Sequence, residues 1–315
     1  MGKKIFKTLD EQVEILKNKG LVIDDETYAK EILLRENYFF LNGYRHLFMK
    51  SLDNNLFIGG TKIEELYSLF LFDRKLRSIF FKNILIVENN VKSIISYQLS
   101  KKYGYREKDY LNPNNFVSNG AKRKQVNDLL GKMKRQIKSN ATGHSATMHY
   151  VNNYGYIPLW VLVKVLSFGI VSELFSILKK EDQYEIVDLY DLDIETFSNY
   201  LVILSNYRNL CAHEDIMFEN RTQKVISDTK YHRILNIPMM DDEYIYGKND
   251  LYALVIILKC LLKDDEIKDM MNEVDKAISN LEFNLRSIPI DKVLDRMGFC
   301  SNYMDIVDIR KKEIF

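Results

Sequence analysis

Residues 61–101, TKIEELYSLFLFDRKLRSIFFKNILIVENNVKSIISYQLSK, contain neither proline nor glycine. Apolar side chains recur along this stretch at the spacing of one α-helical face; they are Leu66, Leu69, Phe70, Leu76, Ile79, Phe80, Ile84 and Val87. Thr61 and Glu64 have the spacing of a capping box, in which two side chains satisfy free backbone amides at a helix N-terminus. The stretch therefore predicts one long helix from Thr61 to about Lys101.

Shorter helices are predicted on both sides of the long one, and the whole chain has only four prolines and 13 glycines. The periodic segments are 10–19, 25–36, 37–50, 121–138, 157–178, 181–189, 194–213, 250–263 and 265–287. Polar or turn-rich segments at 53–60, 103–120 and 139–155 are predicted as loops, and a short hairpin is predicted within 221–247. We expect an all-α fold with an N-terminal helical segment (1–60), a helical domain (61–288) and a C-terminal tail packing on it (289–315).

Composition indicates a globular protein of a reducing compartment. The chain has 315 residues, of which 46% are hydrophobic, enough for a sizeable core. Its cysteines, Cys211, Cys260 and Cys300, are scattered and form no disulfide framework. No apolar run follows the basic N-terminus, and the apolar stretch 157–178 is interrupted by polar side chains, so we expect a cytoplasmic protein without a membrane span.

Positive charge is concentrated in one predicted helix, although the formal net charge of the chain is only +1. The segment 121–138 has a single acid, Asp128, and seven bases: Lys122, Arg123, Lys124, Lys132, Lys134, Arg135 and Lys138. One interpretation is a surface that binds RNA phosphates, with Tyr103, Tyr105 and Tyr110 nearby for base stacking. The other is an ordinary solvated helix face.

The segment Asn199–His213 has an unusual polar side. On a helical wheel, Tyr200, Ile203, Leu204, Tyr207, Leu210 and Cys211 form an apolar arc. The opposite arc lacks the lysines and glutamates of a typical solvent face and consists mainly of short hydrogen-bonding side chains, one arginine and one histidine. Its polar members are Ser198, Asn199, Ser205, Asn206, Arg208, Asn209 and His213.

This R-x4-H pattern suits chemistry on a phosphodiester. A guanidinium offers a permanently charged fork for phosphate oxygens. An imidazole titrates near neutrality and can exchange a proton with a ribose 2′-OH or a leaving oxygen, which requires no metal. The alternative is a helix end at which His213 caps and Arg208 pairs with Glu214 or Asp215. His144 and His149, close to Tyr150 and Tyr154, also have two interpretations: they belong to an RNA cleft, or they are ordinary histidines of a surface loop.

Four blocks in order resemble one protein family. They are 15–25 with 37–44, 72–77 with 86–88, 157–162 with 166–169, and Arg208-Asn209-Leu210-Cys211-Ala212-His213. Over about residues 10–262 the chain is similar to the Abi-like (abortive infection, AbiD/AbiF-type) proteins, a branch of the HEPN superfamily. It departs from many members at Glu214, where they have a second histidine. Asn220-Arg221 retains the family's Asn-Arg pair.

The resemblance implies a HEPN-like helical bundle, a homodimer and a metal-independent endoribonuclease toxin that acts in abortive infection. Arg208 and His213 would be the catalytic pair, with Asn209 as a positioning residue, and no cofactor or metal is expected. RNA would be the substrate, and a small RNA or an antitoxin protein would restrain the toxin. The alternative function is a non-catalytic HEPN module that binds RNA or protein, controlled by a small RNA.

Overall fold

The computed structural model describes residues 5–50 and 55–310. The expected all-α fold is confirmed, because helices and short 3-10 turns account for nearly all the regular structure of these residues. The expected break at 53–60 and the tail at 289–315 lie partly outside the described residues. No helix in the described ranges is both long and apolar enough to cross a membrane.

The predicted long helix is α4 (Ile63–Tyr103), 41 residues long, which corresponds to about 60 Å. It begins one residue later than the capping-box spacing suggested. Glu65, rather than Glu64, accepts a hydrogen bond from the Lys62 amide. The other carboxylate oxygen of Glu65 accepts from the amides of Arg286 and Ser287, so the same side chain fixes α4 to a segment from the far end of the chain.

The N-terminal segment folds into α1 (Leu9–Asn18), α2 (Glu26–Glu36), α3 (Tyr38–Asn42) and the 3-10 turn η1 (Arg45–Phe48). Asp25 caps α2 by accepting from the amides of Thr27 and Tyr28. The single helix expected over 37–50 is replaced by α3 and η1, which are separated by Gly43 and Tyr44.

The middle of the chain differs from the sequence prediction in three segments, the first of which is the expected loop 103–120, because it contains the short helical elements α5 (Glu107–Tyr110) and η2 (Pro113–Asn115). The expected loop 139–155 contains a helix, α7 (Ser145–Tyr154), and the expected helix 157–178 is two helices, α8 (Leu159–Val165) and α9 (Phe168–Ile177). Ser167 separates them, because its hydroxyl accepts from the Ile170 amide and caps α9. The other elements here are α6 (Gly120–Asn140), α10 (Lys180–Val187), η3 (Asp188–Tyr190) and α11 (Ile194–Ala212).

The C-terminal part contains the expected pair of helices, α13 (Leu251–Leu261) and α14 (Asp264–Asn284). The hairpin expected within 221–247 is present as β1 (Met239–Met240) and β2 (Glu243–Tyr244), preceded by the short α12 (Lys230–Ile234). The chain continues through α15 (Asp291–Met297) and η4 (Tyr303–Val307). Tyr252 of α13 donates to the Tyr303 carbonyl, which attaches this last segment to the core.

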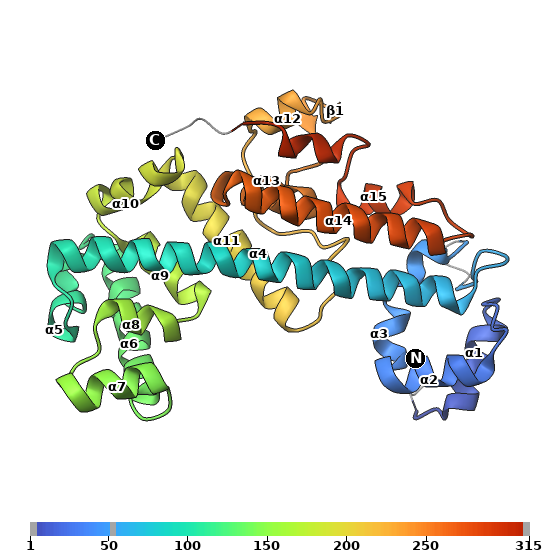
Figure 1. The fold of residues 1–315 in the computed structure, drawn as a ribbon, viewed down its shortest axis with the longest axis horizontal. Helices are drawn as coiled ribbons and strands as arrows, with labels where there is room; N and C mark the ends of the chain where they lie inside the picture. The colour runs from blue at the N-terminus through green and yellow to red at the C-terminus, as the bar shows by residue number, and fades with distance from the viewer. Residues whose placement is uncertain (1–4, 51–54, 311–315) are drawn as a thin grey trace.

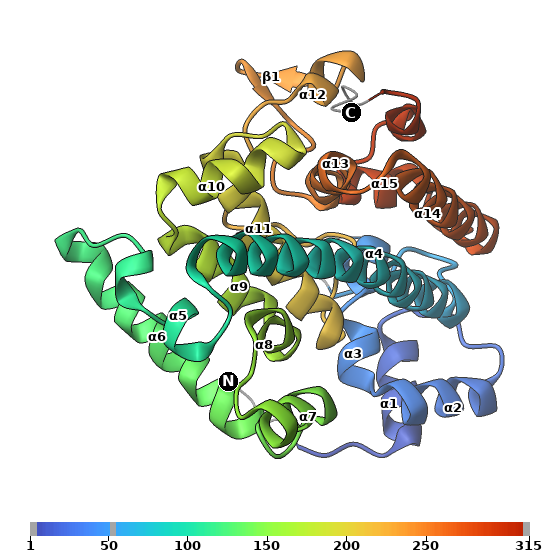
Figure 2. The same cartoon turned by 60° about the vertical axis from the view of Figure 1, so that its left-hand side comes forward.

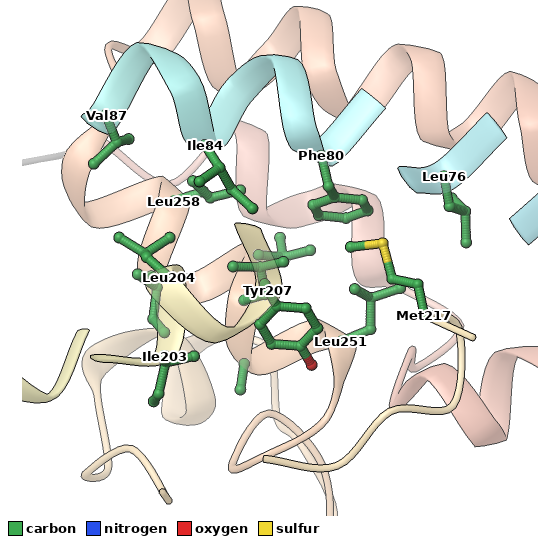
Figure 3. Packing of buried hydrophobic residues seen from close by; sticks show 14 of the residues in the cluster. Leu76, Phe80, Ile84, Val87, Ile203, Leu204, Tyr207, Met217, Leu251 and Leu258 are labelled. Carbon is green, nitrogen blue, oxygen red and sulfur yellow. The ribbon is translucent and has the colours of Figure 1, made fainter. Parts of the chain in front are cut away.

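The core forms where α4, α11 and α13 meet. Figure 3 shows α4 side chains above those of α11 and α13; the labelled residues are Leu76, Phe80, Ile84, Val87, Ile203, Leu204, Tyr207, Met217, Leu251 and Leu258. All are buried. Figures 1 and 2 place α13, α14 and α15 on one side of α4. On the other side, α1–α3 and α5–α8 lie near opposite ends of α4, with the C-terminal end of α11 between them.

Candidate active site

Helix α11 has the two faces that its sequence predicted. Tyr200, Ile203, Leu204 and Tyr207 are buried against α4, α9 and α13. On the polar side, Asn206, Asn209 and His213 are exposed. Ser205 is the exception on that side, because it is buried where α11 packs on α9. Packing of the apolar arc thus fixes the direction in which the polar residues project.

Arg208 is held by two residues of α4. Its Nε atom lies 3.7 Å from Oε2 of Glu88, and its guanidinium carbon lies 5.6 Å from the centre of the Phe81 ring. The other oxygen of Glu88 accepts from Lys92 Nζ at 2.6 Å. The side chain of Glu88 is 6% exposed, whereas that of Arg208 is 35% exposed. The arginine is therefore fixed on its inner side and open to solvent on its outer side.

His213 is the last residue of the motif and the C-cap of α11. Its backbone amide still donates to the Asn209 carbonyl at 3.0 Å. Glu214 follows with a positive φ of 57°, which turns the chain away from the helix axis. Among the described residues, no side-chain hydrogen bond to the His213 ring forms. The alternative pairing of Arg208 with Glu214 or Asp215 is not found, because Glu88 takes that role.

A buried network on α4 anchors the segment that follows His213. The Asp73 carboxylate accepts from the amides of Met217 and Phe218 at 3.0 and 2.7 Å and from the Tyr44 hydroxyl at 2.7 Å. Arg77 pairs with Asp73 at 2.5 Å and also donates to the Asp215 carbonyl. Burial raises the pKa of the Asp73 carboxyl, whereas Arg77 and the two amides oppose that shift.

Sequence reasoning missed this anchoring role. Asp73 and Tyr44 stand within blocks that carry the family resemblance, but neither block indicates that Asp73 meets Met217 and Phe218, which lie 144 and 145 positions further along the chain. An acid within an apolar helical face was the available signal, since a buried carboxylate requires donors from elsewhere in the fold.

A cavity of about 610 Å³ adjoins the end of the motif. Its walls come from the N-terminal segment, from α4 and from the turn after His213; they include Phe39, Phe40, Arg74, Glu214 and Asp215. Arg74 forms two hydrogen bonds with the Glu36 carboxylate. Arg74 is therefore paired with an acid of the N-terminal segment and does not contribute to the contact between α4 and Arg208, which is made by Glu88.

The basic helix α6 is separated from Arg208. It packs on α8 and α9, and α9 in turn packs on α11. Lys132 forms an ion pair with Glu173 at 2.7 Å; the other six basic residues of the predicted RNA surface, Lys122, Arg123, Lys124, Lys134, Arg135 and Lys138, are exposed. Lys122 borders a hollow of about 780 Å³ together with Asn199 and Val202, which belong to the N-terminal half of α11.

Two of the three tyrosines expected to stack on bases are otherwise engaged. Tyr110 is buried and donates to the Ile157 carbonyl. Tyr103 donates to Asp182 at 2.8 Å. Tyr103 is half-buried, and Tyr105, which is 38% exposed, is the most exposed of the three.

Comparison with known proteins gives one match. The sequence matches the model of the Abi-like protein family over residues 31–219, which is more than half of the chain and includes Arg208, Asn209 and His213. No curated protein and no solved structure matches it. The matched span is shorter than the 10–262 suggested by inspection, and it extends from α2 to just beyond the end of the motif. The chain belongs to the Abi-like protein family, a membership that links it to abortive infection.

Proposed function

We propose that this chain is a metal-independent endoribonuclease of the HEPN type, acting as a growth-arresting toxin of abortive infection in the cytoplasm. The observation that carries the proposal is the state of Arg208. Its inner side is fixed by Glu88 and Phe81, its outer side is open, and it lies five residues before an exposed histidine. A permanently charged fork for the phosphate and an imidazole for proton transfer are the two groups that cleavage through a ribose 2′-OH requires.

The reaction follows from these two groups. The 2′-oxygen forms a bond to the adjacent phosphorus, and the bond from that phosphorus to the 5′-oxygen breaks. His213 takes the proton from the 2′-OH or gives one to the leaving oxygen, and Arg208 stabilises charge on the phosphate oxygens. Asn209 is exposed one turn before His213 and would orient its ring once RNA is bound. The products are a 2′,3′-cyclic phosphate and a 5′-OH.

One imidazole cannot supply both the base and the acid at the same moment. A two-fold homodimer would place two copies of the motif in one cleft, so that one His213 removes a proton while the other donates one. The C-terminal end of α11 lies between α1–α3 and α5–α8 on the same side of α4 (Figure 2). Because Asn209 and His213 are exposed there, a second copy of the chain could reach the motif. A small RNA or an antitoxin protein would restrain the toxin.

The test is cleavage of a synthetic single-stranded RNA by the purified protein. Cleavage should persist in EDTA, and mass spectrometry should find the two product ends given above. The same strand with 2′-O-methyl groups should remain intact because it lacks the nucleophile. His213→Ala and Arg208→Ala should each lower the rate by about 10²-fold or more. Asn206→Ala, an exposed change on the same helix, is the matched control and should cleave normally.

The alternative function makes a different prediction for the same assay. A non-catalytic RNA-binding module would bind the strand and leave it whole, and growth arrest on expression would not depend on His213. Glu214 is the residue that favours this alternative, because it stands where many relatives have a second histidine. Wild-type cleavage by a folded His213→Ala protein would refute the assignment of His213.

A further inference from the structure

A continuous run of aromatic rings covers the end of the molecule formed by α5, α7 and α8. We call it the aromatic platform, and its residues are Tyr105, Arg106, His149, Tyr150, Tyr154, Tyr156 and Trp160. Successive ring centres lie within stacking range: Tyr150–Tyr154 at 5.4 Å, Tyr154–Tyr156 at 6.3 Å, Tyr156–Tyr105 at 5.8 Å and Tyr105–Trp160 at 5.5 Å. The guanidinium of Arg106 lies 4.9 Å from the Tyr156 ring centre and 5.9 Å from that of Tyr105.

The outer rings of the platform are exposed, whereas Tyr150 and Tyr156 are half-buried and Tyr150 packs against the core. Tyr154 is 57% exposed, Trp160 44% and Tyr105 38%. The backbone beneath them is nevertheless fixed, because the Ile157 carbonyl accepts from Tyr110 and the Ile157 amide donates to Glu107. Exposed rings on a fixed backbone leave large flat apolar surfaces in contact with water.

The charge around the platform favours a polyanion. Residues 129–172, which include α7 and α8, contain no aspartate or glutamate and five lysines or arginines: Lys132, Lys134, Arg135, Lys138 and Lys164. The two acids of α5, Glu107 and Asp109, accept from the backbone amides of Ile157 and Arg106. Lys164 is exposed and stands one helical turn after Trp160 on α8. A ligand that combines flat apolar rings with a negatively charged backbone matches this surface, and single-stranded nucleic acid has both.

The platform is connected to the candidate active site through α8 and α9. Gly169, at the start of α9, packs so closely on α11 that a Cβ there would lie 3.4 Å from the Ser205 hydroxyl. Ser205 is one turn before Arg208 on α11. Figures 1 and 2 place α7, α8 and the C-terminal end of α11 on the same side of α4. Helix α8 carries both Trp160 of the platform and Lys164, and α9, which follows it in the chain, contacts α11 one turn before Arg208.

We propose that the aromatic platform stacks on unpaired bases of a single-stranded RNA, whose backbone continues past Lys164 to Arg208. This inference takes the identity of the ligand from the proposed function. Paired bases are excluded as ligands because a duplex keeps its base faces stacked on one another and offers only edges and backbone. The platform would therefore restrict the enzyme to unpaired stretches of its target.

The chain offers a direct measurement, because Trp160 is its one tryptophan. The full-length His213→Ala protein, which should bind without cleaving, is titrated with an oligoribonucleotide of about eight nucleotides. Stacking of a base on Trp160 should quench tryptophan fluorescence. The same strand annealed to its complement should not quench it, and a strand of equal length with abasic sites should bind more weakly and leave the fluorescence nearly unchanged.

Variants test the platform apart from its fluorescence. With a labelled strand and anisotropy as the readout, Tyr154→Ala and Trp160→Ala should each weaken binding about tenfold, whereas Trp160→Phe should retain most of the affinity. Phe283→Ala is the matched control. Phe283 is exposed, and the guanidinium carbon of Arg286 lies 5.7 Å from the centre of its ring, as in the platform. It lies on α14, however, on the other side of α4 (Figure 1).

The outcomes separate this inference from the proposed function. Equal affinity of Tyr154→Ala, Trp160→Ala and the parent protein, with unchanged circular dichroism, would refute the platform and leave catalysis at His213 untouched. Equal binding of normal and abasic strands would refute it too. Fluorescence quenching by a strand that the wild-type protein never cleaves would support the platform and count against the nuclease.

Discussion

Arg208 Nε on α11 and Glu88 Oε2 on α4 lie 3.7 Å apart, although 120 positions separate the residues in the chain. The distance is that of an ion pair and is longer than a hydrogen bond, and neither atom has a hydrogen-bond partner among the described residues. The other oxygen of Glu88 is held by Lys92. Glu88 thus holds Arg208 by charge without a hydrogen bond, which leaves the N–H donors of the guanidinium available to a phosphate.

The first prediction concerns Glu88 as a positioning residue. Glu88→Gln keeps the shape and removes the charge, so we expect kcat to fall about tenfold with little change in RNA affinity. The double variant Glu88→Gln/Arg208→Ala should be no slower than Arg208→Ala alone, because Glu88 acts only through Arg208. Single-turnover cleavage rates measure this. Glu173→Gln, which removes a carboxylate paired with Lys132, is the control, and additive losses in the double variant would contradict the role.

A second prediction concerns the anchor of the segment after His213. Asp73→Ala leaves Arg77 buried without its carboxylate and frees the amides of Met217 and Phe218. We expect a loss of about 3–5 kcal/mol in the free energy of unfolding. Tyr44→Phe removes the hydrogen bond to Asp73 and the one that its hydroxyl accepts from Arg77, but keeps the ion pair, and should cost about 1–3 kcal/mol. Urea unfolding followed by circular dichroism gives both values, and an Asp73→Ala protein as stable as the wild type would argue against the anchor.

Helices whose apolar residues recur with helical periodicity could be predicted from sequence. Helix boundaries that depend on the hydrogen bonds of single polar side chains could not. Helix α4 and the core face of α11 follow from spacing alone. Helix α7 arises from a polar stretch because Thr147 is buried at its start, where its hydroxyl donates to the carbonyls of Asn140 and His144. Ser167 breaks an apolar run that the period alone treats as continuous.

The candidate site was predictable in its residues but not in its support. The polar arc identified Arg208, Asn209 and His213, since unusual side chains on one helix face are visible in a single sequence. Helical period gives the face on which a residue lies, and not the partner that it meets. Glu88, Phe81 and Asp73 therefore required the fold, as did the assembly of the aromatic platform from three separate segments.

A third prediction concerns pH and Asp250, whose carboxylate accepts from the amides of Gly247 and Ala253. Burial raises the pKa of Asp250 to about 6. The native state then binds more protons than the unfolded state between about pH 4 and pH 6, so the contribution of Asp250 to stability falls as pH rises through that window. The difference in unfolding free energy between wild type and Asp250→Asn should shrink by up to about 3 kcal/mol across it. Urea denaturation at several pH values measures the difference, and parallel curves would contradict the shift.

A fourth prediction tests the proposed homodimer. If one cleft needs His213 from both copies, dimers of one wild-type and one His213→Ala chain should be nearly inactive. Equal mixtures unfolded and refolded together should then retain about a quarter of the wild-type rate, the share of all-wild-type pairs under random pairing. If each chain cleaved RNA independently of its partner, the same mixture would retain about half of the wild-type rate. Light scattering at micromolar concentration gives the mass of the species, and a fully active monomer would contradict the shared cleft.

The last prediction concerns the exposed bases at the start of α6. Lys122, Arg123 and Lys124 face solvent, and Lys122 borders the hollow beside Asn199 of α11. If they contact RNA phosphates, reversing all three to glutamate should weaken binding by the His213→Ala protein. The slope of log affinity against log salt, which is negative, should also become shallower by about 2, because each phosphate contact to a single strand contributes about −0.7 to it.

The matched control makes the same change in net charge elsewhere. Lys268 and Lys276 on α14 and Lys292 on α15 are exposed, and these helices lie on the other side of α4 from α6–α8 (Figure 1). Their reversal lowers long-range attraction for RNA equally but removes no phosphate contact, so the salt slope should remain close to that of the parent protein. Equal slopes in both triple variants would mean that α6 carries an ordinary solvated face, and the path of the RNA would then run from the aromatic platform to Arg208 without it.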